Sequence, residues 1–152
     1  MIGISLACYG IGISLVQGFL IRLPLISALG ARFVVTASLV IGSFALMSMG
    51  LVREGWVVFC IIPFSALSEL LTPTLGSFLS NSVPDDQQGE LQGVLSSVSA
   101  VTSIVSPLIM SGIFNIFTSK QSSVYFPGGP FIFAAFLLLL TIVPLSSAMK
   151  RK

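Results

Sequence analysis

Five long stretches of this chain are apolar and almost free of charge, and each has the length of a helix that crosses a lipid bilayer. They run over Ile2–Ile21, Phe33–Val52, Trp56–Leu79, Leu91–Phe117 and Phe131–Met149. A membrane-spanning helix needs about 20 predominantly apolar residues. The hydrocarbon interior also requires that backbone N–H and C=O groups are bonded within the structure. We therefore predict an all-α membrane protein with five transmembrane helices.

The composition excludes a protein surrounded by water. Hydrophobic residues make up 55% of the sequence, charged residues make up 8%, and histidine is absent. A soluble domain carries about 25% charged residues. The net charge of +2 is too small to indicate a nucleic-acid partner. The partner that the composition indicates is the lipid bilayer itself.

The sequence contains no pattern typical of a catalytic or metal site. It has no Ser/His/Asp set, no cluster of metal ligands and no glycine-rich phosphate loop, so we expect neither an enzyme nor a bound metal or cofactor. Cys8 and Cys60 lie inside apolar runs without metal-ligand spacing. We expect both to be small buried hydrophobic residues.

The segments between the spans are short, which leaves no room for a domain outside the membrane. The most distinctive is Asp85–Gly93, named here the acidic loop, which holds three of the five acidic residues of the chain. Such a polar segment must lie at a membrane surface. Asp85 or Asp86 can cap the following helix, with Gln88 or Glu90 in its first turn. A role in gating or in binding a partner is the alternative.

The basic residues fall unevenly on the two sides of the predicted bundle. One side has five and the other has two: Arg22, Arg32, Lys150, Arg151 and Lys152 against Arg53 and Lys120. Cytoplasmic loops carry the excess of lysine and arginine, so we expect a cytoplasmic C-terminus and acidic loop and an N-terminus outside. An odd number of helices with an outside start suggests that further sequence normally precedes this chain.

One ionisable residue, Glu69, lies deep within a predicted span. It follows Trp56, a predicted interfacial anchor, by 13 residues, which places it about 20 Å into the membrane at 1.5 Å per residue. A charge near the bilayer centre costs at least about 2.5 kcal/mol, so such residues usually face a cavity and are functional. Burial favours the neutral acid, as a proton carrier requires. Pro73 frees a carbonyl and is expected to kink the helix near Glu69. The alternative is a protonated Glu69 with only a packing role.

Further polar residues suggest a path through the membrane. The fourth span carries one polar stripe at helical spacing: Gln92, Ser96, Ser99, Ser103 and Ser106. Such a stripe can line a water-filled path or allow close helix packing. Gln17 and Asn115 are amides that need partners when buried. With Glu69, the candidate path residues are Gln17, Ser96, Ser99, Ser103 and Asn115.

The same residues suggest how the spans pack. The first, third and fourth have polar residues and are expected to pack on one another. The second has only small contact residues, such as Ser38, Gly42 and Gly50, and the fifth has no polar face. We expect these two to be peripheral, with the fifth facing lipid.

The acidic loop and the residues after it, as far as Pro107, resemble the cytoplasmic loop and eleventh helix of the tetracycline efflux branch of the major facilitator superfamily. The segments Met1–Ala7, Leu29–Arg32, Gly55-Trp56 and Tyr125–Phe131 also fit this branch. The motif residues that carry the resemblance are Asp85, Asp86, Gln88, Gly89, Gln92, Gly93 and Arg32.

The resemblance implies that residues 1–152 are a partial C-terminal half of a transporter whose full fold has twelve helices in two bundles. The five spans would correspond to its last five helices, in a bacterial inner membrane. It also implies a drug–proton antiporter that exports a small amphipathic compound. Gln17 falls where the branch has a glutamine, but Gly42 stands where it has an acidic residue.

Two main interpretations follow. The chain is a truncated or split exporter, active when a separate polypeptide supplies the missing N-terminal helices, because a lone half cannot alternate access. Alternatively, it is a non-transporting membrane remnant with only a structural role. A membrane-embedded enzyme is disfavoured because the sequence carries no catalytic motif.

Overall fold

The computed structural model describes residues 2–19, 29–119 and 125–149, and within these ranges it is helical and contains no strand. The elements are α1 (Ile2–Gly18), α3 (Ala31–Leu51), α4 (Gly55–Ser68), α5 (Leu71–Ser80), the 3₁₀ turn η2 (Asp85–Gln87), α6 (Gln88–Thr118) and α7 (Gly129–Ala148). The predicted all-α class is confirmed. The helix ends that are described lie within three residues of the predicted span ends.

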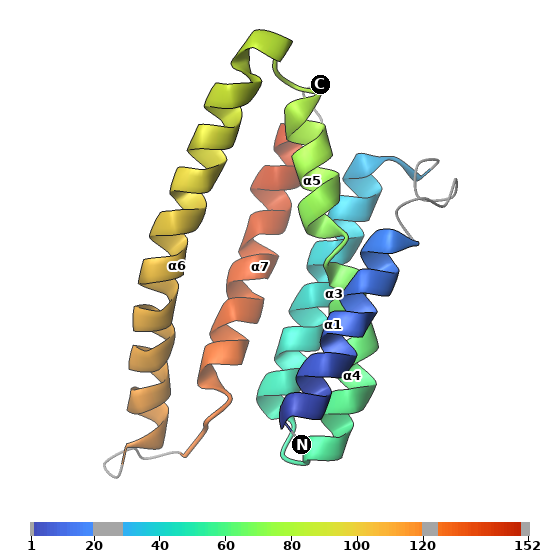
Figure 1. Ribbon diagram of the computed structural model, residues 1–152. Helices are drawn as coiled ribbons and strands as arrows, with labels where there is room; N and C mark the ends of the chain where they lie inside the picture. Colours follow the sequence, from blue (N-terminus) through green and yellow to red (C-terminus); the bar gives the residue numbers. More distant parts are fainter. Residues whose placement is uncertain (1, 20–28, 120–124, 150–152) are drawn as a thin grey trace.

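Within the described residues, four stretches are long and apolar enough to cross a membrane. They are Ala31–Leu51, Gly55–Ser80, Asp85–Thr118 and Gly129–Ala148. The apolar helix α1 is shorter, and the predicted end of its span at Ile21 falls outside the described residues. Successive spans alternate in direction, so α1 starts at the end of the bundle opposite to that where α7 finishes (Figure 1).

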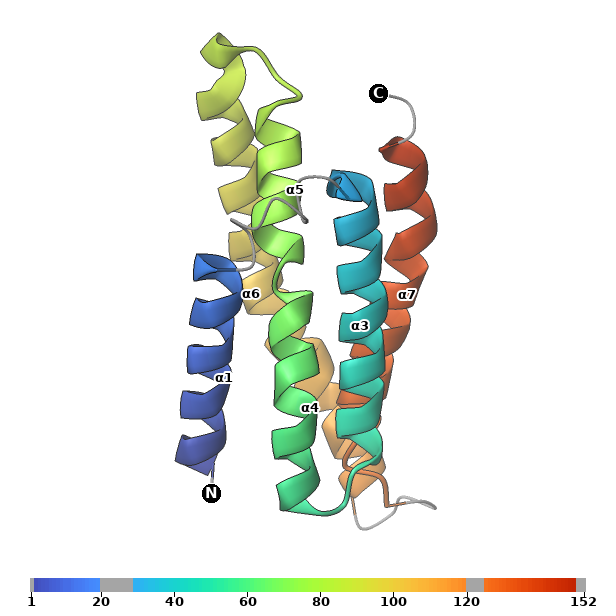
Figure 2. The same cartoon turned by 90° about the vertical axis from the view of Figure 1, so that its right-hand side faces the viewer.

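The third span is broken in the middle into α4 and α5, which stack end to end (Figure 2). Pro73 has no N–H, so it cannot donate to the carbonyl of Glu69 four residues earlier. The amides of Glu69 and Leu70 instead bond three residues back, to the carbonyls of Ala66 at 3.2 Å and Leu67 at 3.3 Å. The helix is thus interrupted where the kink beside Glu69 was predicted, over the two residues Glu69 and Leu70, whose backbones stay in the right-handed helical region.

Contacts link the spans in a row, in the order α1, α4–α5, α3, α7 and α6. In Figure 2, α6 lies behind α4 and α5, so the row is curved rather than straight. Helix α3 contacts α4, α5 and α7, and it supplies the centre of the core: Val35 and Leu39 are 1% and 3% exposed. Side chains of α5 and α7, including Leu75 and Ile142, pack against them. A second cluster joins α1 to α3 and α4 through Val16 and Ala66.

The predicted packing order is wrong in two respects. The second span, α3, is central rather than peripheral, and α7 lies between α3 and α6. The fourth span, α6, was expected to pack with the first and third, but it has no buried residue and its helix partner is α7. Small residues that allow close backbone approach decide packing in a membrane, where apolar area provides no driving force between helices.

Two glycines of α3 show how close this approach is. A Cβ on Gly42 would lie 3.1 Å from the Cβ of Ser68 on α4. Near the other end of α3, a Cβ on Gly128 would overlap the backbone of Gly50. Alanine at either contact would push the helices apart, so these glycines fix the position of α3 between α4 and α7.

The two cysteines also differ from expectation. Cys8 and Cys60 are both free and exposed on the chain's own surface, so the prediction that they are buried is wrong. Both lie on apolar helices, where lipid can cover an apolar thiol without a protein partner.

Candidate functional site

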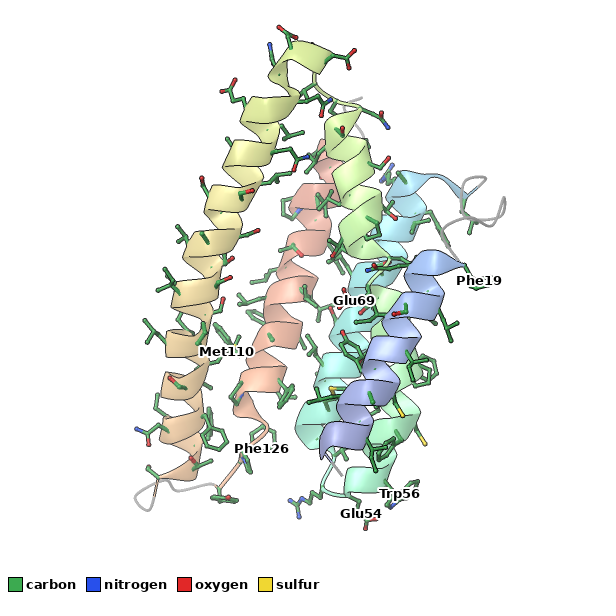
Figure 3. The ribbon with its side chains drawn as sticks, viewed as in Figure 1. Phe19, Glu54, Trp56, Glu69, Met110 and Phe126 are labelled. Carbon is green, nitrogen blue, oxygen red and sulfur yellow. The ribbon has the colours of Figure 1, made fainter. Side chains whose placement is uncertain are left out.

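The carboxyl of Glu69 is held at the break between α4 and α5 by a residue from α1. The Tyr9 hydroxyl donates a hydrogen bond of 2.8 Å to Glu69 Oε1, joining residues 60 positions apart. Both side chains are half-buried. Figure 3 shows Glu69 in the middle of the bundle, beside α1, rather than at either end. The hydrogen-bond partner of Glu69 is therefore a tyrosine on another helix.

Sequence reasoning missed Tyr9. The available signal was modest: Tyr9 is one of two tyrosines in the chain, and it is the one within an apolar span. A phenol hydroxyl buried among apolar helices needs a hydrogen-bond partner. Glu69, the only ionisable group predicted deep in the membrane, was therefore the partner to consider for the Tyr9 hydroxyl.

Glu69 lines a cavity of about 240 Å³ between the packed helices. The polar side chains in its lining come from three helices: Tyr9 from α1, Ser38 from α3, and Ser65, Ser68, Glu69 and Thr72 from the broken span. The apolar part of the lining consists of Leu39, Leu46, Leu71 and Leu138, together with Gly42. Among the described residues that line it, none is a lysine or arginine, and Glu69 is the one charged residue.

Two of the lining hydroxyls are placed by the local backbone. Ser65 is buried, and its carbonyl accepts a 2.7 Å hydrogen bond from the Ser68 hydroxyl. The Cβ position of Gly42 faces Ser68. Gly42, where the resemblance places an acidic residue, thus borders the same cavity as Glu69, and a side chain there would have to displace Ser68.

A second cavity, of about 250 Å³, lies beside the first. It is lined mainly by apolar side chains of α1, α3 and α4, and it shares Tyr9, Leu46 and Ser65 with the first cavity. The other lining residues are Ser5, Leu6, Met49, Val58 and Ile62.

The structure does not bring the other candidate path residues to Glu69. Gln17 is exposed near the end of α1 and lines neither cavity. Ser96, Ser99 and Ser103 are exposed on α6, which is separated from α4 and α5 by other helices of the row. The Ser103 hydroxyl donates to the Ser99 carbonyl at 2.8 Å, within α6.

The remaining candidates on α6 share this exposed position. Asn115 is exposed near the far end of the helix, and its carbonyl accepts the Ser119 amide at 2.9 Å. The polar stripe thus forms a continuous exposed face, and its role remains a prediction.

The acidic loop is held by Gln88 rather than by a carboxylate cap. Asp85 and Asp86 form η2, the N-cap of α6 is Gln87, and no side chain bonds the first amides of the helix. The prediction that Asp85 or Asp86 caps α6 is therefore wrong. Pro84 starts the 3₁₀ turn one residue earlier, which moves both carboxylates away from the cap position.

Gln88 instead fastens the loop to the end of α5. Its Oε1 accepts a hydrogen bond from the Ser80 hydroxyl at 2.8 Å, and its Nε2 donates to the Ser80 carbonyl at 2.7 Å. Gly89, Gln92 and Gly93 are exposed in the first turns of α6.

Arg32 is exposed in the first turn of α3, at the same end of the bundle as the acidic loop (Figure 1). Among the described residues, no group of three or more His, Cys, Asp or Glu side chains could hold a metal ion. The candidate site is thus a single carboxyl with a tyrosine partner and several hydroxyls, an arrangement that can exchange a proton.

Comparison with known proteins finds tetracycline resistance proteins. The chain is 34% identical to the class C protein of Escherichia coli over 75% of its own length, and 32% identical to the class G protein of Vibrio anguillarum over 75%. It is 26% identical to the class H protein of Pasteurella multocida over 90%. This chain resembles part of a tetracycline resistance protein. The resemblance predicted from the sequence is thereby confirmed.

The chain spans only 28%, 29% and 34% of the length of these three relatives, respectively. No family model matches the chain, and no solved structure matches it. The apolar helices and these relatives together indicate an integral membrane protein similar to part of a tetracycline resistance protein.

Proposed function

We propose that this chain is one part of a tetracycline-type exporter, which moves a small amphipathic compound out of the cell in exchange for protons. In this proposal, residues 1–152 are an incomplete helical bundle, and a separate polypeptide supplies the helices that the relatives have in addition. The relatives' names and the share of their length that this chain spans support the proposal. The alternative is a membrane remnant that inserts but does not transport.

The observation that carries the proposal is the Glu69 carboxyl, which faces a cavity at a broken transmembrane helix. Interrupted helices near the middle of the membrane are common at coupling-ion sites of transporters. Because no lysine or arginine among the described residues lines the cavity, none of these residues provides a fixed counter-charge for the carboxylate. A proton that binds from one side and leaves to the other can provide that charge.

We assign to Glu69 the role that the resemblance gives to an acidic residue at position 42. Gly42 and Glu69 border the same cavity, from α3 and from the α4–α5 break. A carboxyl reaching this space from position 69 requires no room at position 42, where Ser68 packs closely. The acidic group is thus present in the cavity, but from the neighbouring helix.

The exposed face of α6 fits the same proposal. Its polar side chains, Ser96, Ser99, Ser103 and Asn115, would contact the missing helices and line the substrate path with them. Gln17, also exposed, would belong to that path on α1. These roles need the complete assembly, since these residues lie apart from Glu69 in the isolated chain.

For orientation we propose a cytoplasmic acidic loop and C-terminus and an N-terminus outside, in a bacterial inner membrane. In a background without Cys8 and Cys60, single cysteines introduced at Asp86 and Ser122 should label from opposite sides of intact cells. Labelling of both from the same side would contradict this topology.

The function is tested by supplying the missing helices from a tetracycline resistance protein, as a fusion or by co-expression, and measuring proton-driven tetracycline export from vesicles. We expect export with the natural chain, loss of proton-coupled export with Glu69→Gln, and no loss with Glu90→Gln, a matched change in the exposed start of α6. Equal export by Glu69→Gln and the natural chain would exclude Glu69 as the coupling residue. No export by the natural chain with any partner would favour the remnant.

A further inference from the structure

Tyr9 lies at the boundary between the two cavities. Its side chain lines the Glu69 cavity and also the second cavity, and its hydroxyl reaches Glu69 at 2.8 Å. Leu46 and Ser65 are the other two residues that both cavities share, and Ser65 is buried. Of these three boundary residues, Tyr9 is the one that donates a hydrogen bond to Glu69.

The second cavity lies closer to the end of the bundle where α1 begins. Its lining includes Ser5 and Leu6 near the start of α1, Val58 near the start of α4, and Met49 near the end of the antiparallel α3. The Glu69 cavity instead includes Ser38 of α3 and Thr72 of α5, which lie further from that end. The two cavities thus form a sequence that leads from one membrane face toward Glu69.

We propose that Tyr9 is a gate and positioning residue, through which a proton reaches Glu69 from the end of the bundle where α1 begins. The inference rests on the proposed role of Glu69 in proton coupling, and it adds the route and the residue that controls it. Among the described residues that line the two cavities, on all the helices that contribute to them, Tyr9 and Glu69 are the titratable ones. No other charged group among these lining residues competes for the proton.

The transfer step leaves the tyrosine unchanged. The phenol oxygen accepts a hydrogen bond from a hydrated proton in the second cavity, passes its own proton to Glu69 Oε1, and keeps the incoming proton as its new O–H. One O–H bond breaks and one forms at Tyr9, and the net result is a neutral carboxyl on Glu69. The aromatic ring meanwhile fills the boundary, so that water does not flow freely between the two sides.

The competing explanation is that the Tyr9–Glu69 bond only packs α1 against α4. A packing role would change stability, but it would not change access to the Glu69 cavity. The hydroxyl donates a hydrogen bond to the Glu69 carboxyl, and its removal should therefore change the vibration of that carboxyl.

The first experiment follows the carboxyl band of Glu69 by infrared spectroscopy, with the full chain in lipid vesicles. Glu69→Gln identifies the band by removing it, and Glu90→Gln should leave it in place. Tyr9→Phe should shift the band, because the carboxyl loses the hydrogen bond from the phenol. The control Tyr125→Phe alters the exposed tyrosine and should leave the band unchanged.

An unchanged carboxyl band in well-inserted Tyr9→Phe would overturn the positioning role. If Tyr9→Phe inserts poorly, the natural chain provides the same test with ring-deuterated tyrosine. The phenol band should then differ between the natural chain and Glu69→Gln. The same phenol band in both chains would also overturn the inference.

The second experiment tests the gate by thiol labelling. In a background without Cys8 and Cys60, Ser68→Cys places a thiol in the Glu69 cavity, which Ser68 lines while lining no part of the second cavity. A small water-soluble reagent added at the end where α1 begins should react at least about tenfold faster after Tyr9→Ala, and at the natural rate after Tyr9→Phe. Equal rates for Tyr9→Ala and the natural residue would exclude the gate.

These outcomes separate the two proposals. If Glu69→Gln abolishes coupled export while Tyr9→Phe leaves the carboxyl band unchanged, the proposed function stands and the role of Tyr9 fails. If Glu69→Gln exports normally, the proposed function fails, whatever the carboxyl band shows.

Discussion

Helices α3 and α6 are both apolar and both long enough to cross a membrane, yet their surroundings are opposite. Helix α3 contacts three other helices and holds eight buried residues, whereas α6 has none. The difference lies in small residues that meet a neighbour: Gly42 and Gly50 contact side chains or backbone of other helices, while Gly93 and Gly112 of α6 have nothing near their Cβ positions. A glycine in a membrane helix therefore indicates close helix packing only when a neighbouring helix or loop lies against it.

The same contrast extends to the polar groups. In the packed part of the row, Glu69 finds its hydrogen-bond partner on another helix. On α6, hydroxyls such as those of Ser97, Thr102 and Ser103 bond carbonyls of their own helix. Polar residues thus connect the helices in one region and remain available to a further partner in the other.

The largest effect should come from Gly128→Ala, which forces a methyl group onto the backbone of Gly50. We expect it to lower the free energy of unfolding by about 3 kcal/mol, the upper part of the range for overpacking. The measurement is unfolding in mixed detergent micelles, followed by circular dichroism. Gly112→Ala on α6 is the control and should not destabilise, since alanine is the better helix former. An equal loss of unfolding free energy in Gly128→Ala and Gly112→Ala would show that glycine contacts do not explain the difference between α3 and α6.

A smaller loss is expected for Leu39→Ala in the centre of the core, where the side chain is 3% exposed. We expect about 2 kcal/mol, at the lower end for buried leucine, since only packing and not water-driven burial is lost in a membrane. Leu108→Ala on α6, 68% exposed, should change the unfolding free energy by less than about 0.5 kcal/mol. A loss at Leu108 as large as at Leu39 would show that α6 is packed in the isolated chain.

Gln88→Ala should cost about 1 kcal/mol, because it removes the hydrogen bonds that hold the acidic loop to Ser80. Asp86→Ala, in the same loop without a capping role, is the matched control and should have a smaller effect. Protease cleavage within the loop should accelerate only in Gln88→Ala. A larger effect of Asp86→Ala than of Gln88→Ala would support the carboxylate cap that the sequence suggested.

The smallest effect is expected for Ser103→Ala, which removes a hydroxyl bonded within α6. The change in unfolding free energy should stay within about 0.5 kcal/mol. Export by the completed assembly is the more sensitive measurement, since it tests whether this exposed face lines a path. Normal export with alanine at Ser96, Ser99 and Ser103 together would leave the stripe without a functional role.

The sequence predicted which segments are helices, because length and apolar composition decide what can lie in hydrocarbon. It also predicted the kink beside Glu69, because Pro73 acts locally. It did not predict the order of the helices in the row, which depends on contacts such as Gly42 with Ser68 and Gly50 with Gly128. These join residues far apart in the sequence, and no local pattern specifies them.

The candidate site was predicted to a similar extent. Glu69 was recognised because a carboxyl deep in a span is costly, but its partner Tyr9 lies 60 residues away. The path proposed along α6 assumed that polar faces turn inward, whereas this face is exposed. The acidic loop was expected to use its carboxylates, but Pro84 shifts them into a 3₁₀ turn and leaves the structural role to Gln88.

Helix α6 is fastened near both ends. Gln88 holds one end to Ser80, and at the other the Phe117 carbonyl accepts the Phe126 amide at 3.1 Å while the two rings meet edge to face at 6.2 Å. Because both ends of α6 are held, its exposed face has a fixed orientation and is not covered by another helix. A partner arriving sideways in the membrane would have no existing contact to displace along that side, so the rate of assembly should be set by lateral diffusion and collision, without a preceding opening step.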